Sequence, residues 1–246
     1  MRIVVWNCFR GDPSKRLEEL STLQPDVVVL PESRAPEEES DRLVWSGRAG
    51  EIGTAVLTTG SYRVVRAPLV PDASPSAAPF HIRGPVSFNL LAVWTFKEPT
   101  YAHGLSRIID AYGPFMRSGP TVVAGDFNGN AIWDKDNKKI NYSVNARRLE
   151  AECGLKSAYH AHTGEAPGAE LQPTLYFQWK REQSFHIDYC FVPDSWDVVS
   201  AEIGSFEHFT TSDHRPLAVT LTVREGAGAG VAQQAIAADG AIPRQE

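Results

Sequence analysis

The chain has 246 residues and a mass of 27.0 kDa, with 42% hydrophobic and 22% charged residues, which excludes wholesale disorder and allows a full core. At a formal net charge of −6, the chain lacks the strongly basic balance typical of proteins that bind long duplexes, which favours a small substrate or one bound over a short stretch; a sum of charges does not reveal local patches. No apolar run approaches the roughly 20 residues of a membrane span, and the apolar N-terminal stretch is too short for a signal peptide. The three cysteines cannot all pair with one another and form no CxxC motif, so we expect a reduced, cytoplasmic protein. We also expect a monomer.

Segments rich in Val, Ile and Leu recur along the chain and predict strands. In chain order these are Arg2–Asn7, Val27–Leu30, Gly53–Thr58, Tyr62–Arg66, Val86–Trp94, Thr121–Ala124, Thr174–Gln178, His186–Val192, Val198–Ile203 and Arg215–Val223. Apolar residues at helical spacing predict helices over Ser14–Leu23, Tyr101–Met116 and Val144–Cys153. Many strands with few helices predict an α/β fold of two packed sheets flanked by helices.

Two segments differ in composition from the rest. Four prolines among Ala and Ser over Pro68–Pro79 predict a surface loop. From about Glu225 onward small residues dominate and no apolar face repeats. We therefore predict one domain over residues 1–224 and a flexible Ala/Gly-rich tail over 225–246.

Polar residues stand at one end of each of several apolar strands, after three of them and at the start of two others. The segments are Trp6-Asn7, Pro31-Glu32-Ser33, Gly125-Asp126-Phe127-Asn128, His186-Ile187-Asp188-Tyr189 and Ser212-Asp213-His214. If these strand ends converge, their carboxylates share one cleft and raise one another's pKa unless a cation offsets the charge. Oxygen ligands suit Mg²⁺ or Mn²⁺, and a metal, a carboxylate that prepares water and a nearby His are the equipment of phosphoester hydrolysis.

Each segment also has an ordinary structural interpretation. Asp126 fits an Asx-turn, Asp213 fits a turn cap, and Glu32 fits a solvated strand end. A lone His such as His186 or His214 is most often structural. The joint occurrence of these segments, in this order and each beside an apolar strand, favours a functional site.

The sequence resembles the endonuclease/exonuclease/phosphatase superfamily, which includes apurinic endonucleases, DNase I-like nucleases, inositol polyphosphate phosphatases and sphingomyelinases. The five segments above carry the resemblance, and they span residues 6 to 214. The resemblance implies a DNase I-like four-layer αββα sandwich of two mixed sheets. It also implies a metal-dependent phosphoric ester hydrolase, with Glu32 as the main ligand of Mg²⁺ or Mn²⁺, Asn7 beside it and Asp213 completing the metal environment.

The resemblance implies catalytic roles as well. Asp126 matches the residue that positions or deprotonates the attacking water, and Asn128 matches the donor that holds a phosphoryl oxygen. His214 matches the histidine that contacts the scissile phosphate, and Asp188 matches the carboxylate that orients that histidine.

The chain departs from the family pattern at two positions. Trp94 stands about where many relatives carry a phosphate-contacting His, and Tyr101 or His103 is a candidate to replace it. His186 stands where relatives often carry Arg, and it is a candidate for substrate binding. Asn130, Ile132 and Trp133 follow the Gly-Asp-Phe-Asn-Gly segment, so we expect them to line the cleft, with Trp133 available for stacking on a base or sugar.

The predicted function is hydrolysis of a phosphodiester by a nuclease or phosphodiesterase, with nucleic acid among the candidate substrates. One alternative is a phosphomonoesterase that acts on a small phosphorylated sugar or lipid headgroup, which the acidic net charge keeps open. The other alternative is a non-catalytic binding module of the same fold.

Overall fold

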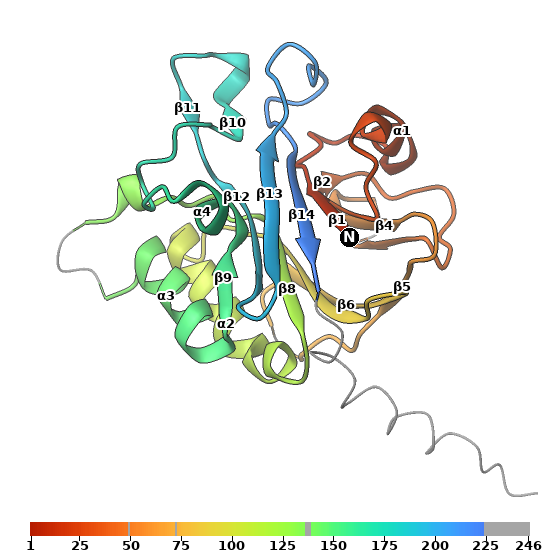
Figure 1. Ribbon diagram of the computed structural model, residues 1–246, viewed down its shortest axis with the longest axis horizontal. Coiled ribbons are helices and arrows are strands. Elements are labelled where there is room, and N and C mark those ends of the chain that lie inside the picture. Colours follow the sequence, from red (N-terminus) through yellow and green to blue (C-terminus); the bar gives the residue numbers. More distant parts are fainter. Residues whose placement is uncertain (49, 72, 136–138, 224–246) are drawn as a thin grey trace, which may run out of the picture.

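Two six-stranded mixed sheets packed face to face form the centre of the computed structural model (Figure 1). The structure describes residues 1–48, 50–71, 73–135 and 139–223, and the predicted tail over 225–246 lies outside the described residues. Helices cover the outer faces of the sheets, so the fold is the predicted α/β sandwich.

The first sheet, sheet A, contains both ends of the described chain. Its order is β13 (Asp197–Ile203), β14 (Leu217–Thr222), β1 (Arg2–Val5), β2 (Val27–Ser33), β4 (Gly53–Thr58) and β3 (Leu43–Ser46). The central strands β1 and β2 are parallel, and every other neighbouring pair is antiparallel.

The second sheet, sheet B, repeats this plan. Its order is β5 (Arg63–Arg66), β6 (Ala77–Arg83), β7 (Phe88–Trp94), β8 (Thr121–Asp126), β12 (Asp188–Pro193) and β9 (Leu155–Ser157). The central strands β7 and β8 are parallel, and the flanking pairs are antiparallel. Each sheet therefore brings the carboxyl ends of two parallel strands to one edge.

Helices cover both outer faces because the central strands are apolar on both sides. In β1, Ile3 and Val5 belong to the core between the sheets, whereas Val4 belongs to the cluster beneath α1 (Pro13–Glu19) and the turn η1 (Ser21–Leu23). In β7, Leu90 faces the other sheet and Leu91 packs beneath helices. This two-sided burial is the reason these strands are continuous apolar runs.

Two long helices, α2 (Tyr101–Arg117) and α3 (Tyr142–Cys153), pack on sheet B (Figure 1). Thr100 caps α2 and Asn141 caps α3 with a side-chain oxygen that accepts a backbone N–H, and Gly154 ends α3 in the left-handed conformation at φ 65°. A short helix, α4 (Ala158–Thr163), follows β9. None of the helices among the described residues has both the length and the apolar character that a membrane span requires.

A small hairpin projects from the end of the sandwich where the site lies. Strands β10 (Leu175–Tyr176) and β11 (Ser184–Phe185) flank the single turn η3 (Phe177–Trp179). Figure 1 shows this hairpin, the β13–β14 connection and α1 at the same end of the molecule.

The expected surface loop over Pro68–Pro79 is wrong at its C-terminal end, because β6 begins at Ala77 and includes Pro79. Pro79 pairs in register with Leu91, and its carbonyl accepts a hydrogen bond from the Ala67 N–H at 3.1 Å. Proline has no N–H to donate to a neighbouring strand, so in the sequence the prolines of this stretch favour a loop over the short strand that forms at its end.

Candidate active site

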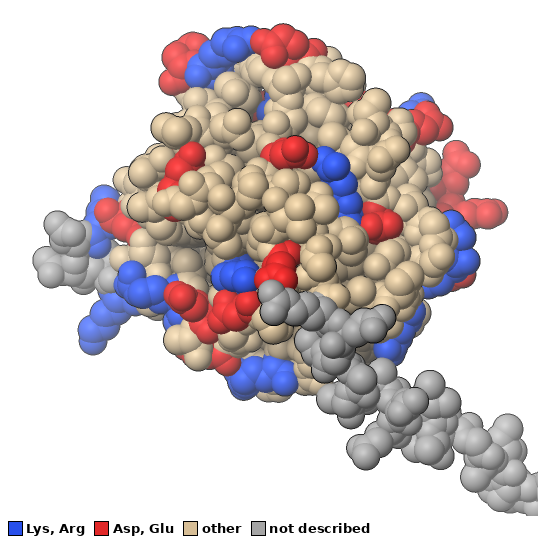
Figure 2. All heavy atoms as spheres, in the orientation of Figure 1, with Lys and Arg blue, Asp and Glu red and all other residues tan. Residues whose placement is uncertain are grey.

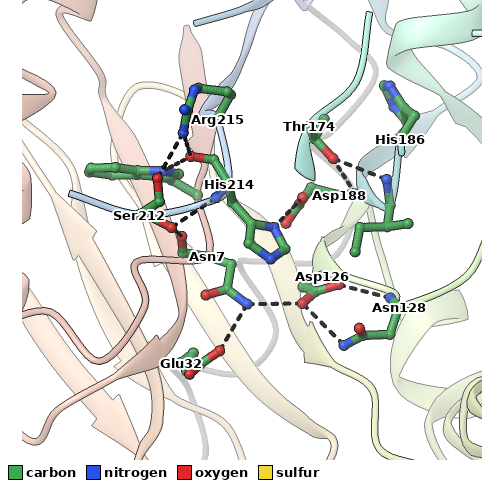
Figure 3. Close-up of polar contacts among 12 residues, drawn as sticks. Asn7, Glu32, Asp126, Asn128, Thr174, His186, Asp188, Ser212, His214 and Arg215 are labelled. Carbon is green, nitrogen blue, oxygen red and sulfur yellow. Dashed lines mark hydrogen bonds and ion pairs between the residues drawn. The ribbon is translucent and has the colours of Figure 1, made fainter. Parts of the chain in front are cut away.

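The polar ends of strands from both sheets meet at one edge of the sandwich (Figure 3). Asn7 follows β1, Glu32 lies in β2, Asp126 ends β8, and Asp188 begins β12. The antiparallel register of β8 and β12 places Asp188 directly opposite Asp126. His214 reaches the same place from the segment that precedes β14, and its ring points toward Asp126 in Figure 3.

Asp126 is the centre of a hydrogen-bond network. Its Oδ2 accepts from Asn7 Nδ2 at 2.9 Å and from Asn128 Nδ2 at 3.1 Å, and its Oδ1 accepts from the Asn128 backbone N–H at 2.8 Å. Burial and then the charge of Asp188 raise the pKa of Asp126 to about 7, although the donors oppose this shift. A carboxyl with such a pKa can accept or release a proton near neutral pH.

His214 and Asp188 form a buried pair. Nδ1 of His214 donates to Asp188 Oδ2 at 2.8 Å, which leaves Nε2 as the ring atom available to a ligand. Burial lowers the pKa of His214, but the charge and hydrogen bond of Asp188, with the charge of Asp126, outweigh burial and raise it to about 9. The imidazole is therefore expected to be a cation at neutral pH.

Thr174 fixes the start of β12. Its Oγ1 accepts the backbone N–H groups of Ile187 and Asp188, each at 3.0 Å, and its carbonyl accepts the Arg215 N–H at 2.6 Å. The side chain is fully buried. Thr174 thus joins the segment of Asp188 to the segment of His214, and sequence patterns identified it only as the start of a predicted strand.

Arg215 supports the Ser-Asp-His segment from behind. Its fully buried guanidinium donates from Nη1 to the carbonyls of Ser212 at 2.7 Å and His214 at 2.8 Å. Tyr176 and Phe206 cover the guanidinium, with ring centroids 5.1 and 4.5 Å from its carbon. Sequence reasoning missed this role because Arg215 was the first residue of a predicted strand.

The Gly-Asp-Phe-Asn segment has a backbone that few residues tolerate. Gly125 has φ 148°, and a Cβ there would lie 1.8 Å from the Val93 carbonyl oxygen of β7. Asn128 has φ 47° and Glu32 has φ 55°, both in the left-handed region. Non-glycine residues in this region carry strain that is common at functional sites.

The candidate metal ligands divide between two places in the site. Glu32 Oε2 accepts from Asn7 Nδ2 at 3.3 Å, so these two residues adjoin Asp126 through the Asn7 amide. Asp213 is largely buried, and its Oδ2 accepts the Gln178 backbone N–H at 3.1 Å, which ties it to the β10–β11 hairpin. The structure therefore joins Asn7 and Glu32 through a hydrogen bond and places Asp213 beside His214.

The chemistry of the donors fits a hard divalent cation. One oxygen each of Asp126 and Asp188 and one ring nitrogen of His214 lie within 4.8 Å of one another. The protonated His214 donates a hydrogen bond and does not coordinate, so the carboxylate oxygens are the atoms of this cluster that suit a cation. Oδ1 of Asp188 is buried without a hydrogen-bond partner among the described residues. Clustered carboxylates with an unpartnered oxygen call for positive charge, and oxygen-rich sites suit Mg²⁺ or Mn²⁺.

The predicted substrate-binding residues differ in their surroundings. Asn130 is buried and donates from Nδ2 to the His186 carbonyl at 2.8 Å and to the Tyr189 hydroxyl at 3.1 Å. His186 is also buried, with its ring 4.4 Å from that of Tyr159. Trp133 is half-exposed, and both Trp133 and Asn130 line a cavity, whereas Ile132 is half-exposed outside that lining.

The residues near the missing family histidine lie at the same edge. Trp94 ends β7 and pairs in register with Asp126 of β8. Tyr101 and His103 begin α2 and line the cavity beside Asn128. Burial and then the charge of Asp126 raise the pKa of Tyr101, so Tyr101 lies within electrostatic reach of the site.

A second buried network supports Asn130 and depends on Glu170. The carboxylate of Glu170 accepts from Asn130 Nδ2 at 3.1 Å and from the Gly168 N–H at 3.0 Å, and it pairs with His160 Nε2 at 3.0 Å. Burial raises the pKa of Glu170, but the bonds from His160, Asn130 and the backbone outweigh burial and lower the pKa from 4.5 to about 2. The ionised form is therefore the one that the fold stabilises.

Replacing Glu170 by Gln should lower the free energy of unfolding by about 1–3 kcal/mol at neutral pH, because an uncharged amide cannot replace the carboxylate. Since the folded pKa is depressed, the wild-type advantage is present above 4.5 and is lost as the pH falls toward about 2. Urea unfolding at neutral and at acidic pH measures both values. Glu182→Gln, at an exposed position on the hairpin, is the control. An undiminished difference in acid would contradict this account.

Comparison with known proteins places this site in a family. A model of the Endonuclease/Exonuclease/phosphatase family matches residues 4–214. No curated protein sequence matches the chain. Among solved structures, an endonuclease/exonuclease/phosphatase from Beutenbergia cavernae is 17% identical, with a TM-score of 0.60, over 91% of this chain and 71% of that one.

Two further solved structures share the fold over almost their whole length. The endonuclease domain of TRAS1, a telomere-specific non-LTR retrotransposon, is 16% identical, with a TM-score of 0.64, over 90% of this chain and 97% of that one. The 3′ phosphatase NExo from Neisseria, bound to a product DNA hairpin, is 19% identical, with a TM-score of 0.65, over 90% and 99%. These likenesses show the DNase I-like fold, and the family match over most of the chain shows that this protein belongs to the endonuclease/exonuclease/phosphatase family.

Proposed function

We propose that the protein is a divalent-metal-dependent phosphodiesterase of the nuclease type. The observation that carries this proposal is the position of Asp126. Its carboxylate accepts hydrogen bonds from two asparagine amides. One of its oxygens lies within 4.8 Å of an oxygen of Asp188 and of a ring nitrogen of His214. A proton acceptor, Asp126, and a cationic hydrogen-bond donor, His214, thus lie close together at one edge of the sandwich.

The residues of the chain have complementary roles in hydrolysis. Asp126 orients a water molecule and accepts its proton as the water attacks phosphorus. Negative charge then grows on the non-bridging oxygens, where the Nε2–H of His214 and the side-chain amide of Asn128 donate. Asp188 keeps the imidazole in the orientation and protonation state that this donation requires.

Asn7 and Glu32 would hold Mg²⁺ or Mn²⁺, with Asp213 completing its environment. When bound, the cation would neutralise charge on the phosphoryl oxygens. The same positive charge would relieve the repulsion among the buried carboxylates, so the protein should be more stable with the metal than without it.

Chelation should abolish hydrolysis of bis-p-nitrophenyl phosphate, and added Mg²⁺ or Mn²⁺ should restore it. Glu32→Gln should raise the metal concentration at half-maximal rate about 10- to 100-fold, because the amide lacks the ligand charge. Initial rates across a metal titration, with Mn²⁺ binding followed by calorimetry, measure both effects. The control is Glu202→Gln, at an exposed ion pair with Arg2. Full activity of the metal-free protein would remove the proposal.

A phosphomonoesterase is the second candidate, favoured by the net charge of −6 and by the likeness to the Neisseria 3′ phosphatase. A panel of abasic duplex, single strand, plasmid, inositol phosphates and bis-p-nitrophenyl phosphate at fixed low salt separates the candidates. Release of inorganic phosphate without cleavage of any diester would favour the monoesterase. Failure to bind Mn²⁺ at all would favour a non-catalytic module.

A further inference from the structure

A largely apolar cavity of about 700 Å³ opens beside Asn128. This volume lies within the range of roughly 300–1,000 Å³ that is usual for small-molecule sites. The aromatic side chains in its lining are Tyr101, Trp133, Tyr142, Phe177 and Phe185, accompanied by Leu175 and Ile187. Asn128 belongs both to the lining and to the Asp126 network. A chemical group bound in this cavity would therefore be a direct neighbour of a phosphate bound at the site.

The cavity presents ring surface to solvent. Trp133 is 48% exposed and Phe177 is 47% exposed, and the rings of Trp133 and Phe185 lie 5.0 Å apart. Among the described residues of the lining, the charged side chains are Asp134 and Lys135, and His103 adds an imidazole. The aromatic and apolar part of the lining suits a flat ring.

A second aromatic surface lies on the Asn7 side of the site. Phe9 and Trp179 are 41% and 40% exposed and meet edge to face with centroids 5.1 Å apart. The Phe9 N–H donates to Asn7 Oδ1 at 3.1 Å, and Trp179 Nε1 donates to the Thr210 carbonyl at 3.0 Å. The hydrogen bonds therefore fix the Phe9 backbone beside Asn7 and the Trp179 ring beside Thr210, and the two rings meet edge to face.

One turn of the hairpin connects the two aromatic surfaces. Phe177 and Trp179 are the first and last residues of η3, and Gln178 between them donates its N–H to Asp213 Oδ2. The turn is thus anchored beside His214, with Phe177 in the cavity and Trp179 against Phe9. Asn7 and Asn128 approach Asp126 from opposite sides in Figure 3. Because Phe9 is hydrogen-bonded to Asn7 and the cavity is lined by Asn128, we place the two aromatic surfaces on the two sides of Asp126.

The charge distribution agrees with recognition through rings. On the face in Figure 2, basic and acidic side chains are interspersed, without a continuous basic stripe among the described residues. Stacking on aromatic side chains tolerates any base, because every base has a π-face, but it requires that the base leave its own stack. Unpaired strands meet this requirement most easily.

We propose that the protein cleaves a phosphodiester in single-stranded nucleic acid, with one flanking base in the cavity beside Asn128 and the other against Phe9 and Trp179. This substrate assignment rests on the proposed phosphodiesterase function. It adds a preference for unpaired bases beside the cleaved phosphodiester, which the catalytic groups alone do not determine.

The first test uses short thymidine strands in which the base on one or the other side of a single cleavable phosphodiester is replaced by an abasic tetrahydrofuran. Each replacement should lower kcat/KM about tenfold or more. Cleavage of the same linkage within a duplex should be slower than within the single strand. Equal rates on base-containing and abasic strands, or faster cleavage of the duplex, would overturn the proposal.

The second test assigns each surface to its side. Phe177→Ala and Trp179→Ala should each lower kcat/KM about tenfold and erase the base preference on one side only, and Phe177→Trp and Trp179→Phe should restore it. Val199→Ala, at an exposed apolar position on β13 that is 54% exposed, is the matched control. Unchanged base preference in both alanine variants would overturn the assignment.

A binding measurement separates failure of this inference from failure of the proposed function. Fluorescence anisotropy with labelled oligothymidylate and an all-abasic strand of equal length requires no turnover. Tighter binding of the base-containing strand, lost in Phe177→Ala, supports base recognition even if no diester is hydrolysed. Equal binding of both strands would overturn it even if bis-p-nitrophenyl phosphate is hydrolysed.

Discussion

Asp126→Asn is expected to lower metal-activated hydrolysis of bis-p-nitrophenyl phosphate by about 10²–10⁴-fold, the usual contribution of a positioned proton acceptor. The amide retains the shape of the carboxylate and one acceptor for the Asn128 backbone N–H. Its NH₂ group can take the place of Oδ2 because the side-chain amides of Asn7 and Asn128 can each turn an oxygen toward it, so the loss of rate reports the missing base. Stability should move in the opposite direction. Burial and Asp188 raise the pKa of Asp126 from 3.8 to about 7, so the metal-free fold loses stability as the pH rises between these two values, and the loss is complete above about 7.

Steady-state kinetics and thermal unfolding in chelator at mildly alkaline pH together measure these opposed effects. The variant should unfold at or above the wild-type temperature while turning over very slowly, a combination typical of a strained functional group. Asp110→Asn, on the exposed side of α2, is the matched control and should change neither quantity. Near-normal turnover by Asp126→Asn would remove the proposed mechanism.

The central strands could be predicted from the sequence because their burial leaves a direct pattern in it. Gly53–Thr58 is bounded as expected, and β1, β2, β7 and β8 coincide with apolar runs. Short or turn-like strands leave no such pattern. Leu43–Ser46, Ala77–Arg83 and Leu155–Ser157 are short or contain proline, and they form strands by pairing with the predicted strands over Gly53–Thr58, Val86–Trp94 and His186–Val192.

The convergence of the strand ends follows from topology that the sequence motifs indicate only through their order. The direction in which a loop side chain turns depends on contacts between segments far apart in the chain. Asp213, for example, accepts from the Gln178 backbone, a partner that no motif contains. Thr174 and Arg215 likewise act on Asp188 and His214 through backbone groups, so residue type alone could not identify them.

The parallel pair in each sheet explains why one edge of the sandwich carries the chemistry. Backbone groups at strand ends are free of the ladder and must find other partners, so polar side chains are favoured there. Two such pairs, β1–β2 and β7–β8, face each other across the core, and each contributes residues to the Asp126 network. The shared core therefore fixes the distance between groups that belong to different sheets.

His214→Ala should lower kcat by about 10²–10³-fold, since a cationic donor to the transition state is lost. Asp188→Asn should lower kcat by a smaller factor, and the double variant should be no slower than His214→Ala alone. This lack of additivity is expected because Asp188 acts through the imidazole of His214, whose Nδ1 is hydrogen-bonded to Asp188 Oδ2 at 2.8 Å. Single-turnover rates of the four proteins form the double-mutant cycle.

The pH dependence of the same proteins tests the electrostatic part of this pairing. Asp188 raises the pKa of His214 to about 9, so the wild-type imidazole stays protonated through neutral pH and loses its proton only as the pH rises through that value. In Asp188→Asn the decline in kcat at alkaline pH should therefore begin at a lower pH. The control is His208→Ala, at an exposed histidine, which should leave the dependence of kcat on pH unchanged. Additive effects in the cycle, together with an unshifted alkaline limb, would show that Asp188 and His214 act independently.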